Sequence, residues 1–199
     1  MPEGPEVKRT AEGLARAMTG KTITNVEILS GRYTKDAPGG IDEFRASLPI
    51  KVIGAGCHGK FIFALCTNET YLWSTLGMTG YWNSEGGKYA RIRLDLSDGS
   101  KVFFNDMRNF GTMKFVKGKH EMVKKLKSLG PDMLAEDVST HKFKTALQAK
   151  PNWSIAKALM KQTLVCGVGN YIKADSLWLA KISPKRKIKD ITDLSLIHI

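Results

Sequence analysis

The stretch that decides the fold class is YARIRLDLSDGSKVFFN (residues 89–105). Between Ala90 and Leu96, apolar residues alternate with two arginines and an aspartate. This period of two is typical of a β-strand with one buried face. Asp98-Gly99 favours a tight turn, so residues 101–105 are expected to return as a second strand. The stretch predicts paired strands in a β-rich region.

The β pattern extends to both sides of this stretch. A helix comes first, with apolar residues at helical spacing from Val7 to Met18 and a stop at Gly20. A short helix around Ile41, Phe44 and Leu48 interrupts the β series before Pro49. The further predicted strands are residues 21–29, 50–56, 60–67, 70–76 and 112–117.

From Lys119 onward the periodicity is helical. Met122, Leu126 and Leu129 share one face, and Gly130-Pro131 ends that helix. Three more helices are expected: one capped by Ser139, one around Ile155 and Leu159, and one over residues 171–181. The chain therefore predicts a β-rich half joined to a helical half near residues 118–135.

The charge favours a polyanionic partner. The 199 residues include 31 Lys and Arg against 19 Asp and Glu, a formal net charge of +12. Residues 1–118 carry a net +4 and residues 119–199 a net +8, so the helical half is the stronger phosphate-binding candidate. A basic face is often only a solvated surface, and that alternative stays open on charge alone.

The three cysteines, at widely spaced positions, predict neither disulfides nor a zinc site. They are interpreted as small buried hydrophobes in a reducing compartment. No apolar run is long enough for a membrane span, and no signal-peptide core follows the start. We expect a soluble intracellular protein, with its location within the cell dependent on the source.

The first six residues, MPEGPE, carry the most distinctive candidate chemistry. Removal of Met1 would leave Pro2 as a free secondary amine, and an α-amino group has a pKa of roughly 7.7–8.0, well below that of lysine. Such an amine can attack a sugar aldehyde carbon and form an iminium ion, with Glu3 and Glu6 as general acid and base. The structural alternative is a proline in the first turn of a helix, with glutamates favouring its N-terminus.

Five further motifs follow in order, and together they indicate a family. They are HGK (58–60), LGMTG (76–80), DMRNFG (106–111), LGPD (129–132) and GVGNY (167–171). With MPEGPE, they resemble the formamidopyrimidine-DNA glycosylase/endonuclease VIII family over nearly the whole chain. The resemblance implies an α+β fold: an N-terminal β-sandwich with a leading helix, then a helical domain with a helix-two-turns-helix motif. The implied domains are a catalytic domain over residues 1–118, a linker over 119–134 and a DNA-binding domain over 135–199.

The resemblance also implies how damaged duplex DNA is handled. Met78 and Phe110 form a wedge that fills the space of an extruded nucleotide, and Arg108 hydrogen-bonds the orphaned base. Lys60 contacts the phosphates that flank the lesion. The alternative is that Met78 and Phe110 are core residues and Lys60 is a surface lysine.

The GVGNY motif supplies the second DNA contact in this resemblance. Gly167 and Gly169 let backbone N–H groups approach a phosphate at a helix N-terminus, Asn170 adds a side-chain contact, and Tyr171 completes the motif.

The implied activity is removal of oxidised bases followed by β,δ-elimination at the abasic site. Pro2 attacks C1′ of the damaged nucleotide, and Glu3 assists ring opening and proton transfers. Neither a metal nor an organic cofactor is needed, and the protein is expected to act as a monomer. Gly4 and Tyr171 lean toward the endonuclease VIII branch and oxidised pyrimidines. The wedge set is shared with the branch that prefers 8-oxoguanine and formamidopyrimidines.

The match departs from the family pattern in several places. Family members usually continue into a β-hairpin finger that supplies a phosphate-binding arginine, and we interpret the end at residue 199 as a truncation. Asn109 and Asp175 stand where Arg and Glu are common. Two other classes stay open: a non-catalytic binder of bent or damaged duplex, and an RNA-binding or ribosome-associated protein.

Overall fold

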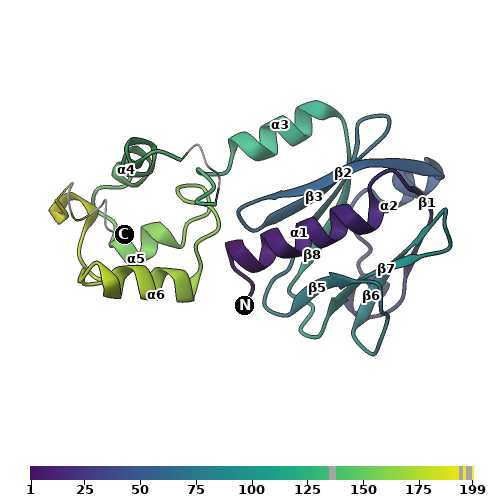
Figure 1. Ribbon diagram of the computed structural model, residues 1–199, viewed down its shortest axis with the longest axis horizontal. Helices are drawn as coiled ribbons and strands as arrows, with labels where there is room; N and C mark the ends of the chain where they lie inside the picture. Colours follow the sequence, from purple (N-terminus) through teal and green to yellow (C-terminus); the bar gives the residue numbers. More distant parts are fainter. Residues whose placement is uncertain (135–137, 193–194, 196–198) are drawn as a thin grey trace. The chain divides into compact units, whose positions relative to one another are not determined.

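The chain forms two compact units, described by a computed structural model that covers residues 1–134, 138–192, 195 and 199 (Figure 1). The first unit comprises Met1–Pro2 and Glu6–Lys124, and the second comprises Glu3–Pro5 and Lys125–Ile199. The short segment Glu3–Pro5 therefore belongs to the second unit although the first helix begins within it.

The first unit is built on antiparallel strands in the order β5-β7-β6-β1-β2-β3-β4-β8. The contact between β1 and β2 is short, with Thr22 opposite Lys51 and Ile23 opposite Ile50. It divides the order into two four-stranded halves, whose inner faces share one core. The strands are β1 (Thr22–Ile28), β2 (Ile50–His58), β3 (Phe61–Cys66), β4 (Thr70–Thr75), β5 (Gly80–Asn83), β6 (Ala90–Leu96), β7 (Lys101–Asp106) and β8 (Thr112–Lys117).

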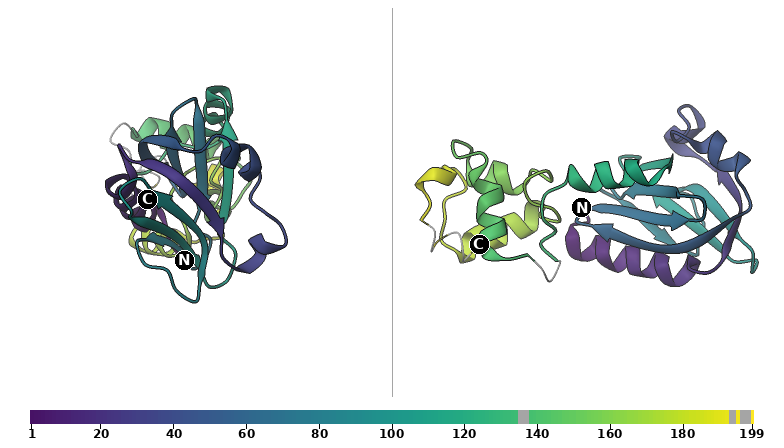
Figure 2. Two further views of the ribbon diagram at one scale, coloured as in Figure 1. Left: turned by 90° about the vertical axis from the view of Figure 1, so that its right-hand side faces the viewer. Right: turned by 90° about the horizontal axis from the view of Figure 1, so that it is seen from above.

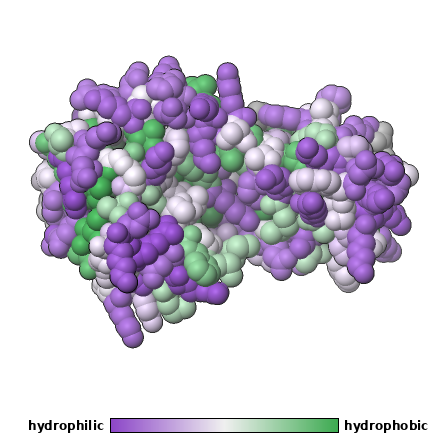
Figure 3. Space-filling model, turned by 180° about the vertical axis from the view of Figure 1, so that it is seen from behind, coloured by the Kyte–Doolittle hydropathy of each residue, from purple (hydrophilic) through white to green (hydrophobic). Residues whose placement is uncertain are grey.

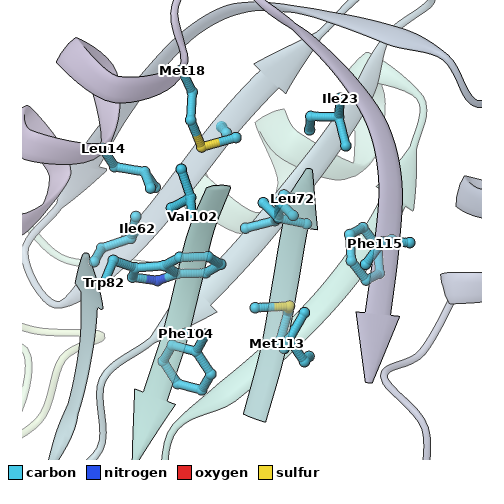
Figure 4. Packing of buried hydrophobic residues seen from close by; sticks show 14 of the residues in the cluster. Leu14, Met18, Ile23, Ile62, Leu72, Trp82, Val102, Phe104, Met113 and Phe115 are labelled. Atoms are coloured by element: carbon cyan, nitrogen blue, oxygen red, sulfur yellow. The ribbon is translucent and has the colours of Figure 1, made fainter. Parts of the chain in front are cut away.

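Helix α1 (Gly4–Met18) closes this core with its apolar face. Leu14 and Met18 point toward Ile62 and Val102, which lie on strands of different halves (Figure 4). All four are buried, so the apolar face of the predicted helix and the apolar residues of the predicted strands pack in one core. The α+β class, with a leading helix and an N-terminal β-sandwich, is confirmed.

The structure contains the predicted strands and one further strand, β5, that was not predicted. Every predicted strand is present, and the short predicted helix is α2 (Ile41–Ala46). Strand β5 was not predicted, because four residues give too short an alternation to recognise from sequence. A 3-10 turn, η1 (Gly31–Thr34), was also missed.

The second unit is helical around a separate core. Leu147, Ile155, Leu159 and Val165 are among its most deeply buried members. Helix α3 (Lys119–Lys127) spans the division between the units (Figures 1 and 2). The remaining elements are α4 (Thr140–Gln148), α5 (Ile155–Leu159), α6 (Asn170–Leu179) and η2 (Ile188–Asp190).

Ser139 caps α4 as predicted, because its side chain accepts a hydrogen bond from the Lys142 N–H at 3.2 Å. We expect Ser139→Ala to lower the free energy of unfolding by about 1 kcal/mol, since it leaves this donor without its acceptor. Urea unfolding measures the effect, with Ser128→Ala as the control. The exposed Ser128 hydroxyl only donates to the carbonyl of Lys125, so an equal loss in both variants would contradict the capping role.

Cys66 and Cys166 are buried, as predicted, whereas Cys57 is half-buried. Burial raises the pKa of the Cys66 thiol to about 12, so this thiol stays neutral at ordinary pH. Hydrophilic residues cover most of the face in Figure 3, with hydrophobic residues in separate patches. No helix in the described ranges is both long and apolar enough to cross a membrane.

Candidate functional site

Glu3 is a buried carboxylate at the N-terminus of α6. Its side chain accepts hydrogen bonds from the N–H groups of Gly169 (2.7 Å), Tyr171 (2.9 Å) and Ile172 (3.2 Å). The first residue before α6 is Gly169, which has no side chain to cap the helix. Glu3 supplies that cap from the other end of the sequence, and its negative charge lies where the helix dipole favours an anion.

This arrangement changes the expected role of the GVGNY motif. The Gly169 N–H, which the sequence assigns to a phosphate, donates to Glu3 in this structure. The Asn170 and Tyr171 side chains are exposed, and Asn170 Oδ1 accepts a hydrogen bond from Lys173 Nζ at 2.7 Å. The motif therefore presents side chains at the surface while its backbone donors hold Glu3.

Two glycines allow close backbone packing in the second unit. Gly4 packs against Gly167, and Gly130 of the LGPD segment packs against Leu164. The Gly4 N–H donates to the Gly167 carbonyl at 2.8 Å, and a Cβ on Gly4 would lie 3.2 Å from Gly167 Cα. A Cβ on Gly130 would lie 2.3 Å from the carbonyl carbon of Leu164, so only glycine fits there. Both motif glycines are explained by packing within the second unit.

Pro2, Glu6 and Lys60 belong to the first unit. Pro2 is half-buried and precedes α1, and Met1 still acylates its nitrogen. Glu6 lies in the first turn of α1 and is exposed. Lys60 is half-buried in the two-residue turn between β2 and β3, where Gly59 has a φ of 57°. Such turns favour glycine at a positive φ, so the motif fixes the place of the lysine.

The predicted wedge residues lie on two loops that touch. We call residues 76–80 and 106–111 the wedge loops. A Cβ on Gly77, whose φ is 58°, would lie 2.6 Å from the Gly111 nitrogen, so the two backbones are in direct contact. Met78 is 38% exposed and Phe110 is 56% exposed. The alternative that these two residues belong to the core is wrong.

Arg108, on the wedge loop of residues 106–111, is exposed together with Met78 and Phe110. Its guanidinium carbon lies 5.0 Å from the centroid of the Phe110 ring. Met107, beside it, is also exposed. The structure therefore brings together a cation and apolar side chains at the surface, an arrangement suited to a stacked, polar-edged partner such as a base pair.

Polar residues that the sequence analysis did not single out hold the second wedge loop from below. The buried Asp106 accepts hydrogen bonds from Thr79 and from the loop backbone. The buried Arg91 donates to the Asp106 carbonyl, and Arg32 donates to the Gly111 carbonyl, each at 2.7 Å. Thr79 and Asp106 lie inside the LGMTG and DMRNFG motifs, and this position in the motifs was the sequence signal that could have identified them.

In the part of the chain that the structure describes, no three His, Cys, Asp or Glu side chains form a group suited to a metal ion. The candidate groups that the structure does present are a proline near the N-terminus, a buried carboxylate and an exposed wedge.

Two family models match the chain. Residues 1–113 match the formamidopyrimidine-DNA glycosylase N-terminal domain, and residues 129–198 match the formamidopyrimidine-DNA glycosylase H2TH domain. This chain belongs to the formamidopyrimidine-DNA glycosylase family. The second match also identifies the helix-two-turns-helix motif that GVGNY predicted.

Relatives in the formamidopyrimidine-DNA glycosylase family cover the chain from end to end. The enzyme of that name from Streptococcus pneumoniae is 34% identical over the whole chain, which spans 74% of that relative's length. The one from Lactiplantibacillus plantarum is 31% identical over 96% of this chain and 71% of its own.

Solved structures of formamidopyrimidine-DNA glycosylases agree with this fold. The Thermus thermophilus protein superposes with a TM-score of 0.84 at 27% identity, over 99% of this chain and 71% of that one. A structure of MutM in complex with DNA containing carbocyclic 8-oxo-G gives a TM-score of 0.85 at 25% identity, over 99% of this chain and 76% of that one.

Proposed function

We propose that this protein is a bifunctional DNA glycosylase and abasic-site lyase that excises oxidised bases from duplex DNA and then cleaves the strand. The observation that carries the proposal is the exposed wedge of Met78, Arg108 and Phe110 on two loops in direct contact. Extrusion of a nucleotide leaves a gap in the stack and an unpaired partner base. Apolar side chains with an adjacent arginine match both needs.

The proposed nucleophile is Pro2, once Met1 has been removed. Its nitrogen attacks C1′ of the damaged nucleotide, and the glycosidic bond breaks as the base leaves with a proton. Opening of the sugar ring gives an iminium ion, whose electron demand allows loss first of the 3′ phosphate and then of the 5′ phosphate. Glu3, held by three N–H groups next to Pro2 in the sequence, is the proposed proton-transfer group, and Glu6 is a further candidate.

The proposed DNA contacts use both units. Lys60 is the proposed contact for the phosphates that flank the lesion, and its place in the β2–β3 turn, directly after Gly59, supports this role. Asn170 and Tyr171 support a second contact through their exposed side chains. We retain the catalytic role of residues 1–118, the linker role of residues 119–134 and the DNA-binding role of residues 135–199, with the protein acting as a monomer. The relatives extend beyond the region matched here, which is compatible with an additional finger in a longer form of this protein.

Formamidopyrimidine and 8-oxoguanine are the lesions to test first, since the relatives carry the formamidopyrimidine-DNA glycosylase name and the similar MutM structure holds DNA with carbocyclic 8-oxo-G. Gly4 and Tyr171 favour oxidised pyrimidines by resemblance, but the packing of Gly4 against Gly167 gives this glycine a structural reason that is independent of the lesion. Duplexes that each carry one of these lesions, or an oxidised pyrimidine, rank the substrates by the rate of base release.

The test of the function is borohydride trapping on duplex DNA with one abasic site. Protein shown by mass spectrometry to lack Met1 is expected to form a covalent adduct, and the adduct yield is expected to fall in Pro2→Gly. Undamaged duplex and structured RNA should give none. EDTA should leave the yield unchanged, because the proposed chemistry uses no metal.

Absence of an adduct from protein that lacks Met1 but binds the abasic duplex would favour the non-catalytic binder. Preferential binding to structured RNA would favour the ribosome-associated class. Salt titration of binding does not separate these classes, because every nucleic-acid binder releases counterions.

A further inference from the structure

We propose that Asp106 is a positioning residue that locks the two wedge loops into one preformed element. The inference rests on the proposed function, because the work of that element is to fill the stack when a nucleotide is extruded. Asp106 is 1% exposed, so it acts through other residues rather than by touching DNA.

The Asp106 carboxylate joins three points of the wedge loops. One oxygen, Oδ1, accepts from the Thr79 hydroxyl at 2.5 Å and from the Arg108 N–H at 3.2 Å. The other, Oδ2, accepts from the Gly111 N–H at 2.7 Å. A single side chain thus binds Thr79, next to Met78 on one loop, and the backbone on either side of Phe110 on the other loop, at Arg108 and Gly111.

Thr79 closes the link between the loops. Its hydroxyl donates to Asp106 and accepts from the Arg108 N–H at 3.0 Å. Hydrogen bonds to charged groups are stronger than neutral ones, and the Asp106 carboxylate that accepts them is 1% exposed. Movement of either loop alone would break the charge-assisted bond between the Thr79 hydroxyl and the Asp106 carboxylate.

The backbone around Asp106 is fixed as well. Arg91 donates to the Asp106 carbonyl and to the Ser30 hydroxyl, and Arg32 and the Tyr33 hydroxyl both donate to the Gly111 carbonyl. Strand β7 ends at Asp106, so the frame is anchored in the sheet.

A preformed wedge matters because insertion orders the side chains that enter the stack. Loops that are already fixed lose less conformational entropy on insertion than mobile loops do, and more of the contact energy offsets unstacking. We therefore expect Asp106 and Thr79 to affect the reaction on duplex DNA and to have no effect on single-stranded DNA, which has no base stack to open.

The decisive variant is Thr79→Val, which keeps the side-chain shape and removes the hydroxyl. Asp106→Asn is a milder test and Asp106→Ala a harsher one. Thr70→Val is the matched control. Thr70 is buried at the start of β4, and within the described residues its hydroxyl makes a local hydrogen bond, to the Asn68 carbonyl at 3.4 Å.

The first measurement uses a duplex with a tetrahydrofuran abasic analogue opposite 2-aminopurine, whose fluorescence rises when it unstacks. The analogue has no aldehyde, so this signal is independent of Pro2 chemistry. We expect Thr79→Val to slow the rise by about tenfold, the factor for loss of one hydrogen bond to a charged group, and Thr70→Val to leave it unchanged.

The second measurement is borohydride trapping on single-stranded and duplex abasic DNA. Thr79→Val should lower duplex trapping and leave single-stranded trapping unchanged. Equal losses on both substrates, or a wild-type fluorescence rate in a folded Thr79→Val, would overturn the proposal. A wild-type protein that binds the duplex without a fluorescence rise would overturn it too. If wild type shows the rise but traps neither substrate, the lyase proposal fails, and the fluorescence rates alone decide the role of Asp106.

Discussion

Glu3→Gln is expected to slow base excision by about 100-fold or more and to lower the free energy of unfolding by about 1–3 kcal/mol. The two effects have different origins. The first comes from loss of a proton-transfer group beside the proposed nucleophile. The second comes from the helix cap, because both carboxylate oxygens accept hydrogen bonds from the start of α6.

Glutamine cannot replace this cap because its side-chain amide has one acceptor oxygen and one NH₂ group. If its oxygen takes the place of Oε2, the bonds from Gly169 and Ile172 survive, but the Tyr171 N–H faces another donor. The reverse orientation leaves two backbone donors unsatisfied. Glu3 is 1% exposed, so water does not supply the missing acceptor.

Excision rates on an oxidised-base duplex and urea unfolding measure these effects, with Glu12→Gln as the control. Glu12 is exposed on α1, and its substitution removes the same charge. Trapping on a preformed abasic site should fall less than excision, since the aldehyde form of that site already has an open sugar ring. Equal excision rates in Glu3→Gln and wild type would show that Glu3 is only a helix cap.

The Glu3 cap also shows where sequence reasoning stops. The sequence predicted a helix near the start of the chain and a helix after Gly169, and α1 and α6 are both present. The link between them joins residues more than 160 positions apart, and local periodicity contains no signal for such a pairing. A helix N-terminus with open amides suggested a phosphate because the sequence does not show which anion already occupies it.

The first unit was easier to predict where a strand alternates over several residues or a tight turn marks the next strand. Ala90–Leu96 alternates and the Asp98-Gly99 turn marks Lys101–Asp106 as its partner, whereas the four residues of Gly80–Asn83 do not suffice. The wedge residues came from resemblance, and their exposure came from the structure. The polar frame beneath them could not be predicted, because Arg91 reads as the polar face of a strand and yet is 7% exposed.

The double variant Met78→Ala/Phe110→Ala is expected to lose about 100-fold in excision from duplex DNA. Extrusion costs a few kcal/mol, and each 1.4 kcal/mol that the wedge no longer offsets lowers the rate about tenfold. Both side chains are exposed, so the free energy of unfolding should change by less than about 0.5 kcal/mol for each substitution. Excision kinetics on a lesion-containing duplex and urea unfolding measure the two quantities.

Ile53→Ala/Val123→Ala is the matched control, because it removes two other exposed apolar side chains, which are 53% and 40% exposed. It should excise at the wild-type rate. Single-stranded abasic DNA should be trapped equally by the wedge variant and wild type, since an unpaired strand has no stack to refill. A wedge variant that loses activity equally on both substrates would place Met78 and Phe110 in general DNA binding. Loss on the duplex alone would mean that these two side chains offset the cost of opening the stack, which is the step that separates a base-excision enzyme from a protein that only binds bent DNA.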